Sequence, residues 1–147
     1  MAQVSKNIRQ AWEFLMKRGK GFDSLLKNAE LISAGEGTCK CKMVVEEHHV
    51  NKMKTLHGGM TATLVDSVST MALVCTEPYL PGVSVDLSVS YLRGAPLGEE
   101  ITIDAKALKI GKNLSFLTVD VTDSKGKLIA QGKHTKFVSK DQPVIGE

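Results

Sequence analysis

Residues 51–66 read NKMKTLHGGMTATLVD, and this stretch combines a loop, a glycine pair and the start of a helix. It joins a loop that contains Asn51 to a Gly58-Gly59 pair, and then to a run of small residues with one carboxylate, Asp66. Glycines where a helix begins leave backbone N–H groups bare and let a ligand approach closely. A carboxylate held near such donors provides the chemistry that hydrolysis needs, so the stretch predicts part of an active site.

The helix that begins at this glycine pair is expected to run from about residue 58 to 77 and to be buried on nearly all sides. Its apolar residues recur at the spacing of one helix face: Met60, Leu64, Val68, Met71, Ala72 and Cys75. Asp66 lies about 200° around the helix from Leu64, on a face of small and polar residues. A carboxylate there is costly to desolvate unless it is paired or used. The plain alternative is a solvated face, or a hydrogen bond from the side chain to Ser69 or Thr70.

Asp66 follows Gly58 by eight residues, which is about 12 Å of helix. One substrate carbonyl cannot touch both the Gly58 N–H and Asp66 of the same chain at that separation. If both groups serve one reaction, they come from different subunits, with the two helices antiparallel across a two-fold interface. The spacing therefore predicts a composite site in a homodimer. His57 could act as a base in it, or simply fix the turn.

The flanking segments predict a single α+β domain over residues 1–147. Apolar residues at helical spacing predict an N-terminal helix over about residues 4–18. Alternating patterns predict a hairpin over about 30–46, and then four strands in a meander, which are near residues 83–92, 100–109, 113–123 and 127–138. Residues 139–147 are expected to be a frayed tail. One sheet wrapped on the central helix satisfies this order.

The composition excludes several classes of protein. Hydrophobic residues make up 42% of the chain and charged residues 24%, with a net charge of +3, which is typical of a globular domain. The lysines are scattered and aromatic residues make up only 5%, which disfavours a nucleic-acid surface. No apolar run approaches the ~20 residues that span a bilayer. Three cysteines without a paired framework favour a cytoplasmic location, and the basic first twenty residues make a mitochondrial location the alternative.

Two further patterns have both a functional and a plain interpretation. Cys39 and Cys41, together with His48 and His49, suggest a zinc site, but no C-x₂-C pair completes it. We therefore expect no metal. The turn at residues 109–113, KIGKN, could hold phosphates through its lysines and backbone N–H groups, or could be a solvated turn.

The chain resembles the hotdog-fold acyl-CoA thioesterases of the PaaI-like group. Residues 51–66 carry the likeness, and the stretches 69–73, 81–86 and 126–132 extend it over about residues 5–138. The resemblance implies a hotdog fold, in which a six-stranded antiparallel sheet wraps around a long central helix, here with an extra N-terminal helix. It also implies hydrolysis of medium- to long-chain fatty acyl-CoA to fatty acid and CoA without a metal or cofactor.

The same resemblance implies roles for particular residues. Asp66 would be the general base or nucleophile, and the Gly58 N–H would hold the oxyanion. Asn51 would orient the water or the carbonyl, Ser84 would position the water, and His57 would shape the helix end. Asp66 and Ser84 would come from one subunit and the other three from its partner. The residues that would contact the substrate are Gly59, Ser84, Asp86, Tyr91, Arg93, Lys109, Gly111 and Lys112. Arg93-Gly94 departs from the Ser-Pro-like pair expected there.

The resemblance further implies homodimers that pair edge strands near residues 83–92, and homotetramers built from two such dimers. Two other functions stay open, namely an acyl-CoA hydratase or dehydratase on the same fold, and a non-enzymatic acyl-CoA carrier or adaptor. The N-terminal helix, with Trp12 and Phe14, is the candidate surface for a lipid-transfer protein partner. The plain alternative is that this helix only covers the sheet.

Overall fold

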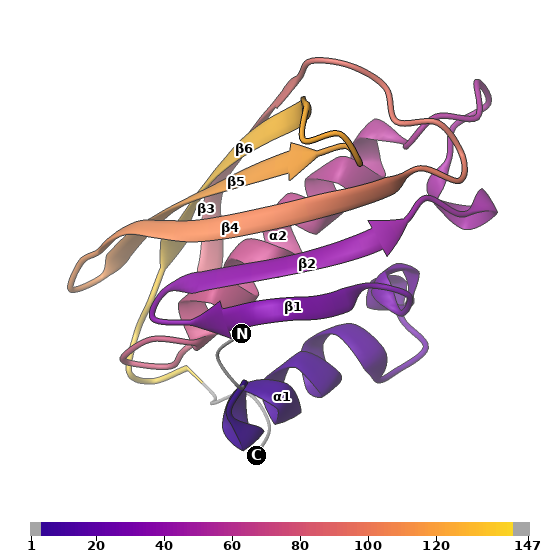
Figure 1. Ribbon diagram of the computed structural model, residues 1–147. Coiled ribbons are helices and arrows are strands. Elements are labelled where there is room, and N and C mark those ends of the chain that lie inside the picture. Colours follow the sequence, from indigo (N-terminus) through magenta and orange to yellow (C-terminus); the bar gives the residue numbers. More distant parts are fainter. Residues whose placement is uncertain (1–3, 143–147) are drawn as a thin grey trace.

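Helix α2 (Gly58–Val74) packs against one face of a six-stranded antiparallel sheet in the computed structural model, which describes residues 4–142 (Figure 1). The strands are β1 (Glu30–Gly35), β2 (Thr38–Val44), β3 (Val83–Tyr91), β4 (Glu100–Ile110), β5 (Leu114–Thr122) and β6 (Leu128–Phe137). The shorter helical segments are α1 (Lys6–Trp12), η1 (Glu13–Lys17), η2 (Phe22–Leu26) and η3 (Glu47–His49). The predicted α+β architecture, a sheet around a central helix, is confirmed.

The strand order is β1-β2-β4-β5-β6-β3, which corrects the predicted meander of the last four strands. Strands β4, β5 and β6 do form a meander, but β3 pairs with β6 and not with β4. The other side of β4 is taken by β2. Consecutive strands are neighbours only as a tendency. Local sequence patterns locate strands, whereas contacts between distant segments choose their neighbours.

Strand β3 lies at an edge of the sheet, and a bulge between Ser84 and Asp86 changes which of its side chains face α2. The unbroken alternation predicted for this strand would place Ser84 and Leu87 on opposite faces. The register instead pairs Ser84 with Lys136 and Leu87 with His134, and both β6 residues are buried on the inner face. A bulge adds one residue and so reverses the alternation locally. This brings Ser84 to the side of the sheet that holds α2.

The core lies between α2 and the sheet. Leu64, Val68 and Met71 of the predicted apolar stripe are fully buried. Strand β6 passes so close to the helix that a Cβ at Gly132 would stand 2.5 Å from Val65 Cγ1. Only glycine allows this approach, so Gly132 sets the distance between β6 and α2 near Asp66.

The predicted N-terminal helix consists of α1 and the π-helical turn η1. The Ser5 side chain caps α1 by accepting a hydrogen bond from the Ile8 N–H. Trp12 and Met16 are almost completely buried in the core, whereas Phe14 is exposed. Trp12 is therefore unavailable to a protein partner, which corrects that part of the prediction, whereas a partner surface that uses the exposed Phe14 stays a prediction. Trp12 and Met16 make this segment a cover for the core. Within residues 4–142 no helix is long and apolar enough to cross a bilayer.

Candidate active site

The side chain of Asp66 projects from the open face of α2 and is half exposed. Ser69 and Thr70 donate hydrogen bonds to the main-chain oxygen of Asp66, at 3.1 and 2.7 Å, and not to its carboxylate. The predicted alternative, in which these two residues satisfy the carboxylate, is therefore wrong. Within residues 4–142 the carboxylate accepts no hydrogen bond, and the basic side chain within 4.0 Å of it is His134, whose Nε2 lies 3.9 Å from Oδ1. Its oxygens can therefore accept hydrogen bonds from a water.

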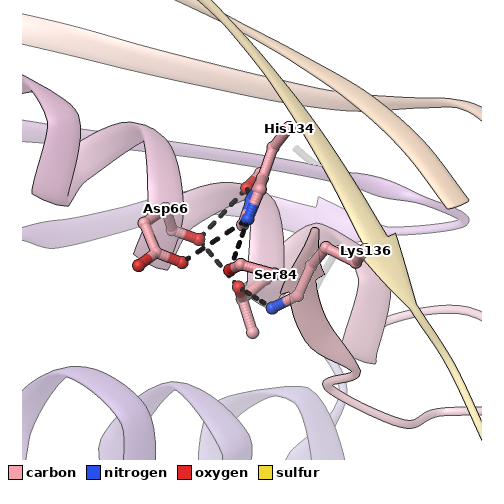
Figure 2. Close-up of polar contacts among 6 residues, drawn as sticks. Asp66, Ser84, His134 and Lys136 are labelled. Carbon is pink, nitrogen blue, oxygen red and sulfur yellow. Dashed lines mark hydrogen bonds and ion pairs between the residues drawn. The ribbon is translucent and has the colours of Figure 1, made fainter. Parts of the chain in front are cut away.

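A buried histidine of β6, His134, links Asp66 to Ser84 (Figure 2). Its Nε2 lies 2.7 Å from Ser84 Oγ, and its Nδ1 lies 2.8 Å from Ser69 Oγ. Sequence reasoning did not select His134. Its position on the inner face of a strand, two residues after Gly132 and two before Lys136, is the signal that could have found it. Ser84, which was predicted, meets Asp66 only through this ring.

The hydrogen-bond network assigns the tautomer of His134. Ser69 donates its hydroxyl hydrogen to the Asp66 carbonyl, so Ser69 Oγ accepts from the His134 Nδ1–H. Nε2 of the neutral ring then accepts the hydroxyl hydrogen of Ser84. Burial, and after it the Lys136 ammonium, lower the pKa of His134 to about 4, although Asp66 and Asp86 oppose the shift. The ring is therefore neutral at pH 7, and Ser84 Oγ has lone pairs left for a water.

The N-terminus of α2 forms a second group of predicted residues. The His57 side chain caps the helix, because its Nδ1 accepts the Gly59 N–H at 2.8 Å. The Gly58 N–H, by contrast, has no acceptor within the described part of the chain. Tyr91 of β3 donates its hydroxyl hydrogen to the Gly58 carbonyl at 2.7 Å and so holds this end in place. The geometry thus distinguishes the two glycines and leaves Gly58 as the donor for a ligand.

Asn51 organises the loop that leads into α2. Its Oδ1 accepts the Met53 N–H at 2.9 Å and the Thr55 N–H at 3.2 Å, and its Nδ2 donates to Thr55 Oγ1 at 3.0 Å. These bonds use one of the two Nδ2 hydrogens. The second hydrogen is left for a ligand, close to the Gly58 end of the helix.

The remaining predicted contacts are spread over the surface. Arg93 forms an ion pair with Asp123, with 2.5 Å between Nη2 and Oδ2. The backbone N–H groups of Lys127 and Lys125, and then this Arg93 guanidinium, hold the pKa of Asp123 below its usual range. The outer face of the sheet carries Asp86, which pairs with Thr135. Asp86 is therefore not part of the group around Asp66.

The hairpin between β4 and β5 carries the predicted Lys109, Gly111 and Lys112. The Gly111 N–H donates to the Leu114 carbonyl at 2.8 Å and closes the turn, and both lysines are exposed. Ile110 pairs with Ser115, Ser115 with Lys136, and Lys136 with Ser84. The hairpin therefore lies at the same end of the sheet as Ser84.

The residues considered for zinc are otherwise engaged. His49 uses both ring nitrogens, since Nδ1 accepts the Glu46 N–H and Nε2 lies 2.9 Å from the Leu25 carbonyl. Cys39 and Cys41 are buried, and burial raises the pKa of both thiols. In residues 4–142 no group of three or more His, Cys, Asp or Glu side chains could hold a metal ion.

Similarity to known proteins assigns this chain to a family. Residues 53–130 match the model of the Thioesterase superfamily. Acyl-coenzyme A thioesterase 13 from Mus musculus is 53% identical over 94% of this chain and 99% of its own. The crystal structure of zebra fish thioesterase superfamily member 2 superposes with a TM-score of 0.87 at 48% identity, covering 93% of this chain and 100% of that one. A hypothetical thioesterase protein with coenzyme A from Streptococcus pneumoniae TIGR4 superposes with a TM-score of 0.73 at 26% identity, covering 77% and 87%. The chain therefore belongs to the thioesterase superfamily and has the hotdog fold that its sequence resemblance implied.

Proposed function

We propose that the protein hydrolyses medium- to long-chain fatty acyl-CoA to fatty acid and CoA, in active sites shared by two subunits. The observation that carries the proposal is that the Asp66 carboxylate and the Ser84 hydroxyl both lie next to His134 Nε2, at 3.9 and 2.7 Å, with the Ser84 hydrogen already donated to that nitrogen. Support for the substrate class comes from the 53% identity to a protein named acyl-coenzyme A thioesterase 13, and from the coenzyme A in the Streptococcus pneumoniae structure.

In the proposed reaction a water donates one hydrogen to the Asp66 carboxylate and the other to Ser84 Oγ. A lone pair of the water oxygen attacks the thioester carbon while Asp66 takes the water's proton as general base. The new C–O bond places charge on the carbonyl oxygen, which the N–H of Gly58 of the partner subunit holds, with Asn51 of the partner subunit beside it. The C–S bond then breaks, and the CoA thiolate receives the proton held by Asp66. The reaction uses only side chains, a backbone N–H and water.

An edge strand with no outer neighbour supports the shared site. Within residues 4–142, β3 pairs only with β6. Its Val83, Val85 and Tyr91 side chains are each more than half exposed. Such a group of apolar side chains is unusual on the edge strand of a monomeric protein. A second β3 paired antiparallel with the first would cover them and make the two α2 helices antiparallel. Leu114, Phe116 and Phe137 form a second exposed apolar group on the outer sheet face, which supports a tetramer of two such dimers.

An apolar cavity supports medium to long acyl chains. It has a volume of about 560 Å³ and lies between α1 and the end of α2, with Ala11, Val74 and Tyr79 in its lining. Val74 follows Asp66 by eight residues, which is about 12 Å along the helix and about 80° around it. An extended chain advances roughly 1.2 Å per single bond, because a residue of three bonds spans about 3.5 Å. An acyl chain of about ten carbons would therefore reach from Asp66 to this cavity.

A cytoplasmic location, with a mitochondrial one as the alternative, goes with this proposal. It is supported by three free and buried cysteines, Cys39, Cys41 and Cys75, which suit a reducing compartment. Fractionation of cells that express the full chain tests it, and recovery only from the secreted fraction would contradict it.

The test is a thiol-release assay over an acyl-CoA series from four to eighteen carbons, with wild type and Asp66→Asn in parallel. The amide cannot take a proton from water, so the rate should fall by about two to four orders of magnitude. The matched control is Asp104→Asn, which removes an exposed carboxylate from the outer face of β4 and should leave the rate unchanged.

Three outcomes would contradict the proposal. Undiminished turnover in a folded Asp66→Asn protein would remove Asp66 from the chemistry. Tight acyl-CoA binding without release of thiol would indicate a carrier. Hydration of an enoyl-CoA without release of CoA would indicate a hydratase.

A further inference from the structure

Lys136 of β6 is a buried cation without a carboxylate partner. It is only 4% exposed, and within residues 4–142 no Asp or Glu oxygen lies within 4.0 Å of its Nζ. The ammonium donates a hydrogen bond to Thr70 Oγ1 at 2.6 Å (Figure 2). Removing an ammonium from water in this way is costly unless the charge is used. None of the chemical steps proposed above uses it.

The position of Lys136 connects it to every member of the site around Asp66. The β3–β6 register places it directly opposite Ser84. It follows His134 by two residues on the same inner face of β6. Thr70, which accepts its hydrogen bond, donates in turn to the Asp66 main-chain oxygen at 2.7 Å. Lys136 is therefore joined to the site through Thr70 and through the strand pairing with Ser84.

We propose that Lys136 is a positioning residue that keeps His134 neutral, so that Ser84 remains a hydrogen-bond acceptor for the attacking water. This inference rests on the proposed hydrolysis, because it assigns a role in the same site. It concerns the direction of one hydrogen bond, the one between Ser84 and His134.

A protonated His134 would reverse that hydrogen bond. Its Nε2 would carry a hydrogen and donate to Ser84 Oγ, or pair with the Asp66 carboxylate 3.9 Å away. Ser84 would then turn its own hydrogen toward the water, and the base would be partly neutralised by a cation. A positive charge already placed beside the ring makes a second one there unfavourable.

Charges on three elements act on the ring, and the charge of Asp86 does so from the outer face of the sheet. Asp66 of α2 and Asp86 of β3 favour protonation of His134, whereas Lys136 of β6 opposes it. Burial is the largest cause of the lowered pKa of His134, and Lys136 is the second. Loss of the Lys136 ammonium should therefore raise the pKa of His134 part of the way to its ordinary value. Burial should maintain the rest of the lowering.

The experiment compares Lys136→Met, which keeps the length of the side chain without its charge, with wild type. The ring ¹³C–¹H signals of His134 are followed by NMR against pH, and kcat and KM are measured over the same range with one acyl-CoA. The midpoint of the His134 titration should rise by about one pH unit or more. The acid limb of kcat should move upward by the same amount, while KM and the rate at pH 8 to 9 stay near wild type.

Two controls separate charge from structure. Lys133→Met removes an exposed lysine from the outer face of the same strand and should change neither the titration nor the rate. Lys136→Arg retains the cation and should keep the wild-type acid limb. Lys136→Gln, which can still bond to Thr70, provides a second neutral variant if the methionine variant does not fold.

An unchanged His134 midpoint in a folded neutral variant would overturn the inference, as would a rate that falls by the same factor at every pH. The titration does not depend on turnover, so the two proposals fail separately. A wild-type protein that releases no thiol refutes the proposed function, whereas normal release with an unmoved titration refutes only the role of Lys136.

Discussion

At the scale of single residues, the direction of one hydrogen bond determines what the next residue can do. The Asp66 carbonyl can only accept, so Ser69 must donate to it and accept from His134. The other ring nitrogen of His134 must then accept from Ser84. Each group in this chain is oriented by its neighbour, which is how a buried polar network specifies a single arrangement. As a result of this series of hydrogen bonds, Ser84 can only accept a hydrogen bond from a water.

The buried His134 should make the folded protein less stable in acid. Its pKa is about 4 in the folded protein against an ordinary value of 6.5, so the unfolded chain binds more protons between these values. Stability should therefore decrease as the pH falls from 6.5 to 4, by about 2 to 3 kcal/mol in total. Urea unfolding of wild type and His134→Gln at fixed protein concentration, at pH 7 and pH 4.5, measures this loss.

Between pH 7 and pH 4.5, the His134→Gln variant should lose about 2 to 3 kcal/mol less stability than wild type. His48→Gln removes an exposed histidine and serves as the control, with a loss equal to that of wild type. An equal loss in His134→Gln and wild type would contradict the prediction.

At the scale of elements, α2 presents different surfaces to different partners. Its apolar stripe faces the sheet, where Gly132 lets β6 approach Val65. Its N-terminus offers the Gly58 N–H, and its open face carries Asp66. The α1 segment stands beside the last turn of this open face and encloses the cavity near Val74. We therefore expect α1 and α2 together to determine which acyl chain lengths the protein prefers.

Filling the cavity should shorten the preferred acyl chain. Ala11 of α1 lines the cavity, and Ala11→Phe would occupy part of it. The value of kcat/KM should fall about tenfold or more for chains beyond ten carbons, because several methylenes lose their apolar contacts. It should stay within about twofold for a six-carbon chain, which ends before the cavity. The thiol-release assay over the acyl-CoA series measures both effects.

The control for this variant is Gln10→Phe, which adds the same ring to an exposed position of α1 outside the cavity lining. It should leave the chain-length profile unchanged. A loss in Ala11→Phe that is equal for all chain lengths would show that the cavity does not hold the acyl chain.

At the scale of the whole molecule, the proposed function gives one chain two half-sites. Asp66, Ser84 and His134 form one half, and Gly58 and Asn51 form the other, about two turns of helix away. The unpaired edge of β3 is the surface across which a second copy would join them. A monomer of this protein should therefore be inactive.

Mixing two inactive variants should restore activity. Asp66→Ala removes the base, and Gly58→Pro removes the oxyanion donor. Proline is tolerated at Gly58 because this is the first residue of α2 and the preceding His57 has an extended backbone. In a mixed dimer one site combines both defects, and the other combines two wild-type halves. A fully exchanged equimolar mixture should therefore reach about a quarter of the wild-type rate in the thiol-release assay, because random pairing makes half the dimers mixed.

Native mass spectrometry verifies that mixed dimers have formed. Pairing the Asp66→Ala chain with a chain that carries both substitutions provides the control, since no intact site can arise. Absence of recovery in verified mixed dimers would mean that each chain holds its own complete site.

The sequence by itself determined the parts of this protein that depend on local spacing. The periodicity from Met60 to Cys75 determined the central helix, and the glycine pair determined where it begins. The step of eight residues from Gly58 to Asp66 determined that one substrate carbonyl cannot touch both groups of the same chain. These features could be predicted because a helix has a fixed rise and a fixed angle per residue.

Only the tertiary structure decided which distant residues meet. His134 and Lys136 lie more than sixty residues after Asp66, and the pairing of β3 with β6 brings them to it. One bulged residue puts Ser84 on the inner face, which unbroken alternation would have excluded. Strand neighbours and bulges depend on long-range packing and leave little trace in local periodicity. For this reason the sequence determined the spacing of Gly58 and Asp66, and the fold decided what surrounds Asp66.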